Sequence, residues 1–143
     1  MPRGNGNVRK TKIRRRIDVT IPYPALSTNK MYSGRKRRSV YYKSFRKKVF
    51  QYLDGHLDGH VNLRGNLGLK LEVGFSSPLS DLSNAIKALE DIMTEYLHFN
   101  DRQIVHIEMF KYLVNKGEEY MKLSIYKTKR NVDRRHNAKK IHE

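Results

Sequence analysis

Residues 67–97 read LGLKLEVGFSSPLSDLSNAIKALEDIMTEYL and carry the two clearest secondary-structure signals of the chain. Apolar side chains occupy alternate positions from Leu67 to Phe75, which predicts a half-buried strand. The strand ends at Ser77-Pro78. From residue 81 to 97 the apolar residues recur at helical spacing and form one broad stripe, which predicts an amphipathic helix. A strand followed by a helix is therefore the centre of the predicted fold.

The flanking sequence adds a second helix and three further strands. Residues 17–21 alternate and stop at Pro22, and Ser39 is a suitable cap for a helix through about Leu53. Strands are predicted at 103–112 and 119–126, with a turn at residues 115–117 between them. The order β-α-β-α-β-β predicts one small domain of the α+β (mixed α/β) class, whose last two strands form an antiparallel hairpin.

Composition excludes several protein classes. The chain has 143 residues, one domain's worth, and no cysteine, so disulfide frameworks and Cys-ligated zinc sites are excluded. No stretch approaches the roughly 18 apolar residues of a membrane span. The first 22 residues are basic and lack an apolar core, so a secretory signal is not expected. We expect a cytoplasmic protein.

The charge is concentrated at the two ends of the chain. Residues 1–48 carry 16 basic side chains and one acid, whereas residues 49–126 carry 7 basic and 11 acidic side chains. The last 17 residues are again basic. This pattern predicts flexible basic arms at 1–16 and 128–143 around a domain at 17–127. Such arms suit a polyanion, and neither has the apolar face that membrane binding needs, so nucleic acid is the expected partner.

The polar face of the 81–97 helix carries side chains that suit phosphodiester chemistry. Asp81, Asn84, Lys87 and Asp91 fall within an arc of about 120°, and Asp101 follows in the next turn. Carboxylates bind Mg²⁺ while leaving waters on it, and the metal can activate a bound water against a phosphodiester. A lysine can stabilise the developing charge. The group therefore indicates metal-dependent cleavage of nucleic acid.

Ordinary structural roles explain the same residues. Lys87 and Asp91 are spaced as an i, i+4 helix pair, Asp81 could cap the helix, and Asp101 could be a turn residue. The residues alone leave three functions open: a nuclease, a non-catalytic junction or other nucleic-acid-binding protein in which the acids form a solvated helix face, and an RNA-associated basic protein.

The segments DLSNAIKALED at 81–91 and FNDRQI at 99–104 resemble the RusA-like Holliday junction resolvases. The family pattern is D-x-D-N-x-x-K-x-x-x-D, then a turn, then D-D-x-Q-[IV]. The resemblance implies a Mg²⁺-dependent endonuclease, often encoded by phages, that works as a homodimer in the bacterial or phage-infected cell. It implies paired symmetric nicks across a four-way DNA junction, which leave ligatable duplexes.

The resemblance also implies roles for individual residues. Asp81 and Asp101 would bind the metal, Lys87 would be the essential lysine, and Asp91 would be a further catalytic acid. Ser83 and Asn100 stand where the family has aspartates. Ser83 is a weaker ligand that could hold a metal-bound water, and Mn²⁺ is a possible substitute for Mg²⁺.

Basic and aromatic residues outside the helix are candidate DNA contacts. Tyrosines 23, 32, 41 and 42 lie among basic residues and could stack on unpaired bases. The predicted phosphate contacts are Arg14, Arg15, Arg16, Lys30, Arg35, Lys36, Arg37, Arg38, Lys43 and Lys47.

Overall fold

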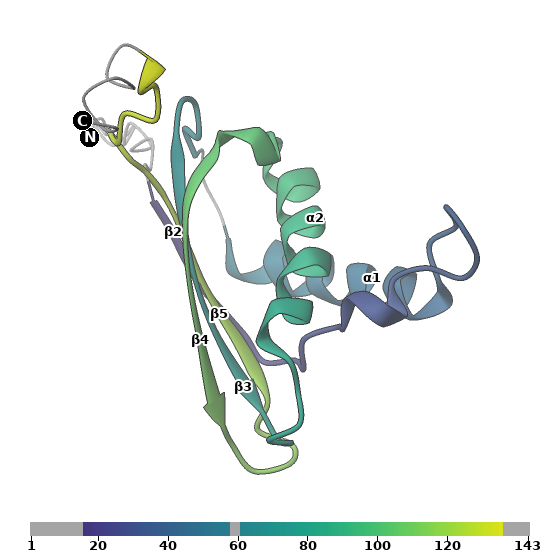
Figure 1. Ribbon diagram of the computed structural model, residues 1–143. Coiled ribbons are helices and arrows are strands. Elements are labelled where there is room, and N and C mark those ends of the chain that lie inside the picture. Colours follow the sequence, from purple (N-terminus) through teal and green to yellow (C-terminus); the bar gives the residue numbers. More distant parts are fainter. Residues whose placement is uncertain (1–15, 58–60, 136–143) are drawn as a thin grey trace, which may run out of the picture.

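The computed structural model describes residues 16–57 and 61–135. It has two layers: a four-stranded sheet and two helices that cover one of its faces (Figure 1). The strands are β2 (Arg16–Ile21), β3 (Leu67–Phe75), β4 (Ile104–Leu113) and β5 (Tyr120–Lys127), and the helices are α1 (Val40–His56) and α2 (Ile86–Leu97). Three short 3₁₀ helices connect them: η1 (Thr28–Lys30), η2 (Leu82–Ala85) and η3 (Asp101–Gln103). The predicted α+β class and the order of elements are confirmed.

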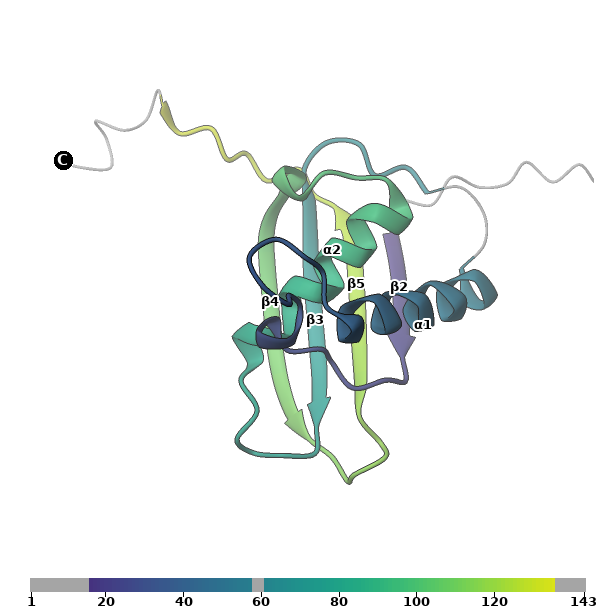
Figure 2. The same cartoon turned by 90° about the vertical axis from the view of Figure 1, so that its right-hand side faces the viewer.

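The predicted C-terminal hairpin is wrong. The strand order is β2-β5-β3-β4, so β3 lies between the two strands that were expected to pair (Figure 2). β4 runs parallel to β3, and β5 runs antiparallel to both of its neighbours, β2 and β3. The turn at 115–117 forms, with Gly117 at φ +95°, but its segment passes over the end of β3, where the Val114 N–H donates to the Phe75 carbonyl at 2.8 Å.

Glycines on β3 explain why β5 lies beside it. Gly68 and Gly74 face Tyr126 and Tyr120 of β5 across the antiparallel ladder. A Cβ atom at either glycine would collide with the facing tyrosine ring. Both rings therefore occupy the space above these glycines, on the sheet face that carries no helix.

The helix boundaries differ in detail from the prediction. Ser39 caps α1 as expected, accepting a hydrogen bond from the Tyr42 N–H at 3.0 Å, and the helix continues to His56. The segment predicted to start α2 at residue 81 is a 3₁₀ turn, so regular α-helix begins only at Ile86. α2 ends at His98, which adopts a left-handed conformation with φ 58°.

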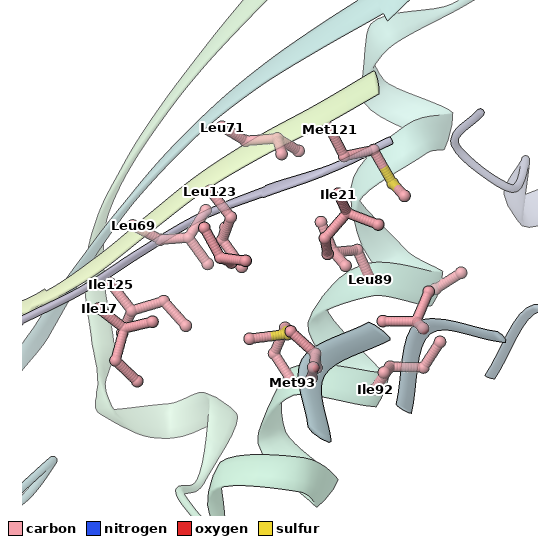
Figure 3. Close-up of a cluster of buried hydrophobic side chains, with 14 of the residues drawn as sticks. Ile17, Ile21, Leu69, Leu71, Leu89, Ile92, Met93, Met121, Leu123 and Ile125 are labelled. Atoms are coloured by element: carbon pink, nitrogen blue, oxygen red, sulfur yellow. The ribbon is translucent and has the colours of Figure 1, made fainter. Parts of the chain in front are cut away.

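The core lies between the sheet and α2 (Figure 3). Leu69, Leu71 and Leu123 from the sheet meet Leu89 and Met93 from the helix, and all five are buried. The apolar stripe predicted for residues 81–97 thus forms the inner face of α2. In the described part of the chain, no helix is long and apolar enough to cross a membrane.

Replacing Leu71 with alanine should lower the free energy of unfolding by about 2–5 kcal/mol, because the cavity forms at a fully buried position in the central strand. Urea denaturation monitored by circular dichroism measures this. The matched control is Leu79→Ala, since Leu79 is 92% exposed; its effect should stay within about 0.5 kcal/mol. Equal effects of the two variants would contradict the packing described here.

Candidate active site

Asp81 organises the start of the helix segment that is predicted to carry the chemistry. Its Oδ1 accepts hydrogen bonds from the Ser83 N–H at 3.2 Å and the Ser83 hydroxyl at 2.9 Å. Its Oδ2 accepts from Nδ2 of Asn84 at 3.2 Å. Asp81 thus caps η2, and the side chains of Ser83 and Asn84 both turn toward it. The structure brings these three predicted residues together.

Asp81 and Asn84 face a cavity of about 350 Å³. The loop after β2 forms its opposite side through Ser27 and Asn29, and Thr28 secures this loop by donating to the Asn84 carbonyl at 3.0 Å. Glu119, which precedes β5, lines the same cavity and was not identified from the sequence. No sequence pattern indicated Glu119, because it reaches the cavity only where the segment between β4 and β5 crosses the end of β3.

Asp91 forms the centre of a second cluster. Lys87 Nζ lies 3.0 Å from Asp91 Oδ1, and Arg38 Nη2 lies 3.0 Å from Oδ2. The Arg38 guanidinium also lies between two aromatic rings, 4.3 Å from the Tyr42 centroid and 4.8 Å from the Tyr32 centroid. Both carboxylate oxygens of Asp91 are therefore paired with cations, one with Lys87 and one with Arg38.

The charge state of Lys87 follows from these contacts. The hydrogen bond to Asp91 raises the pKa of Lys87 above its ordinary value, although partial burial acts against it. The negative charges of Asp91, Glu90 and Asp101 raise the pKa further. Lys87 is therefore a cation at neutral pH, suited to bind a phosphate oxygen and not to remove a proton.

Asp101 occupies the first position of η3, beyond the end of α2. Asn100 caps this turn: its side chain accepts from the Arg102 N–H at 2.9 Å, and its own N–H donates to the Gln103 side chain at 2.8 Å. Asn100, which stands where the family pattern has an aspartate, thus caps the 3₁₀ turn. Nε2 of Gln103 donates to the carbonyls of Leu63 and Gly65, which fixes Asp101 near the start of β3.

Asp81 and Asp101 do not meet within one chain. Lys111, near the end of β4, donates to the carbonyls of Pro78 and Ser80 at 2.8 and 2.6 Å, so Asp81 lies at that end of the strand. Asp101 precedes the start of β4 at Ile104. The seven residue-to-residue steps from Ile104 to Lys111 span about 23 Å of strand.

A divalent metal needs several oxygen ligands at one point. Among residues 16–57 and 61–135, no three His, Asp or Glu side chains are grouped to hold a metal ion. No group of this kind therefore surrounds Asp81 or Asp101 in the described part of the chain. The assignment of Asp81, Ser83 and Asp101 as metal ligands stays a prediction.

The predicted DNA contacts occupy different places. Arg35, Lys36 and Arg37 are exposed on the loop before α1, and Lys30, Lys43 and Lys47 are exposed nearby. Arg16 lies on β2, where its Nε is 3.0 Å from Oδ2 of Asp18. Arg14 and Arg15, like most of the predicted arms, lie outside the described residues.

The four tyrosines predicted to stack on bases differ in how exposed their side chains are. Tyr32 and Tyr41 are exposed, whereas Tyr42 is buried in the core. Tyr23 is half-buried and packs edge-on against Tyr52. Tyr32, Arg38, Lys43, Arg46 and Lys87 line one open cleft between α1 and α2, so exposed aromatic and basic groups lie next to the predicted essential lysine.

Comparison with known proteins supports the resemblance seen in the sequence. The family model described as Endodeoxyribonuclease RusA matches residues 22–125, which include both aspartate segments, Lys87, both helices, β3, β4 and most of β5, whereas β2 precedes the match. No curated protein matches the chain. Members of the matched family are endodeoxyribonucleases that resolve Holliday junctions and generally depend on a divalent metal. The chain belongs to the RusA endodeoxyribonuclease family.

Proposed function

We propose that this protein is a Mg²⁺-dependent homodimeric nuclease that resolves four-way DNA junctions by paired symmetric nicks. The observation that carries the proposal is the cluster around Lys87, in which a protonated amine is held by Asp91 and lies in the field of Asp101. A fixed cation beside carboxylates, on the surface of a basic member of a nuclease family, suits phosphodiester cleavage.

Each residue of the cluster has a distinct proposed role. Lys87 binds a non-bridging phosphate oxygen and stabilises charge that develops there. Asp91 holds Lys87 in place from one oxygen and Arg38 from the other. Among the described residues, Asp81 and Asp101 form no ion pair with a basic side chain, so their oxygens remain open to a hard cation, Mg²⁺ or its substitute Mn²⁺.

DNA binding is proposed to start on the exposed loop before α1. Arg35, Lys36 and Arg37 contact phosphates there, and Lys43 and Lys47 extend the basic surface along α1. Tyr32 and Tyr41 are exposed next to these residues and stack on unpaired bases at the junction centre. The arms add affinity that weakens as the salt concentration rises.

The purified protein should nick a labelled four-way junction symmetrically in Mg²⁺ and leave a linear duplex intact. Asp101→Asn should abolish the nicks and leave junction affinity unchanged, because it removes one exposed carboxylate and none of the basic side chains that contact phosphates. Gel analysis of the two labelled strands and a mobility-shift titration measure the two properties. Tight binding without nicks in Mg²⁺ and in Mn²⁺ would instead indicate a non-catalytic junction binder that retains the family fold.

Arg38 and its neighbour Arg37 should behave differently when replaced by alanine. Arg38→Ala releases one oxygen of Asp91 and should lower the single-turnover cleavage rate by about 10–100-fold, since a charged hydrogen bond contributes about 1.5–3 kcal/mol. Junction affinity should change little. Arg37→Ala should show the reverse, weaker affinity with an unchanged rate at saturating protein. A lower affinity for both variants, with equal rates, would make Arg38 a DNA contact only.

A further inference from the structure

Basic side chains gather at the end of the sheet next to Asp101. At this end β3 and β4 begin and β5 ends (Figure 2). Leu67 of β3 pairs with Ile104 of β4 on one side and with Lys127 of β5 on the other, so the three strand ends lie in one row. The segments that adjoin this row hold five basic side chains and a single acid, Asp101. The five basic residues, here called the terminal basic surface, are Arg64, Arg102, Lys127, Lys129 and Arg130.

The basic tail predicted from residue 128 begins with a segment that is hydrogen-bonded to the domain. The Thr128 N–H donates to the Asn66 carbonyl at 3.0 Å, and Nδ2 of Asn66 donates to the Arg130 carbonyl at 3.1 Å. The Arg130 N–H in turn donates to the Thr128 hydroxyl at 3.2 Å. Lys129 and Arg130 are therefore carried by a folded segment, and a ligand that binds them does not have to order their backbone.

The loop before β3, which holds this segment, also holds the turn that carries Asp101. Nε2 of Gln103 donates to two carbonyls of the loop at 2.6 and 2.9 Å. Asn66 belongs to the same loop and ties the C-terminal segment to it. A ligand bound by Arg64 and Lys129 would therefore occupy a fixed place relative to Asp101.

The exposed cations of the terminal basic surface can accept a ligand. Arg64, Arg102, Lys129 and Arg130 are exposed, and none of them forms an ion pair with another side chain of the described part of the chain. Arg38, by contrast, is paired with Asp91. Exposed arginines and lysines gathered in this way are the usual contacts of a phosphate backbone.

The terminal basic surface is separate from the basic loop before α1. That loop projects away from the sheet on the helix side, whereas the surface lies where β5 ends (Figure 1). DNA is the polyanion on which the family acts. We propose that the terminal basic surface binds the phosphate backbone of a junction strand beside Asp101. This inference rests on the DNA binding in the proposed function and not on the cleavage step.

The salt dependence of binding tests the surface. Fluorescence anisotropy with a labelled four-way junction is measured in EDTA, so that no strand is cut. For Lys129→Ala/Arg130→Ala, the logarithm of the binding constant should fall less steeply with the logarithm of salt concentration, by about 2, since each phosphate contact contributes about 0.9 to the slope. The matched control Lys116→Ala/Lys122→Ala also removes two exposed cations and should keep the wild-type slope. An unchanged slope in the first variant, or equal changes in both, would overturn the surface.

A substitution without charge change tests whether the segment is held in place for binding. Asn66→Ala removes the hydrogen bond to the Arg130 carbonyl and should weaken junction binding by about 2–10-fold, the effect of one hydrogen bond. Asn115→Ala, an exposed asparagine in the turn between β4 and β5, is the control and should bind like the wild type. Thermal melting confirms that both variants fold. Wild-type affinity of Asn66→Ala would show that the basic residues act as an unattached tail, and would overturn the surface as described.

Addition of Mg²⁺ separates this inference from the proposed cleavage. A wild type that binds the junction, with the expected losses in the variants, but never nicks it would count against the cleavage and leave the surface standing. A wild type that nicks the junction while Lys129→Ala/Arg130→Ala keeps the wild-type salt dependence would overturn the surface alone.

Discussion

The apolar stripe of α2 must be buried against the central strands, and this requirement determines where most of the candidate site residues lie. With Leu89 and Met93 held against Leu71 and Leu123, the helix cannot rotate. Its outer face, which carries Lys87 and Asp91, is thereby turned toward α1 and the loop before it. The same packing sets the direction of α2, so that the segment before the helix contacts Lys111 near the end of β4 and the segment after the helix leads into the start of β4. Asp81 and Asp101, which flank the helix in sequence, are consequently kept apart by its length.

Periodicity and local capping were sufficient to predict the elements, because these depend on neighbouring residues. The alternation from Leu67 to Phe75 and the hydroxyl of Ser39 act within one strand or one turn. The order of strands could not be obtained in this way. A turn at Gly117 reverses the chain, but it does not determine which strand the returning segment joins. Here the decision depends on contacts between residues distant in sequence, in which Gly68 and Gly74 accept the rings of Tyr126 and Tyr120. A glycine in a strand indicates that another group packs closely against the backbone. The local sequence does not identify which residue that group belongs to.

The same distinction applies to the candidate site. Lys87 and Asp91 were correctly expected to interact, since they are one helical turn apart. Arg38 was predicted to bind DNA along with the basic residues around it, but it is 53 positions from the carboxylate that binds it. Only the folding of the loop onto α2 distinguishes Arg38 from Arg37. The role of Asp101 stays a prediction, because among the described residues no group of three His, Asp or Glu side chains forms around it to hold a metal ion.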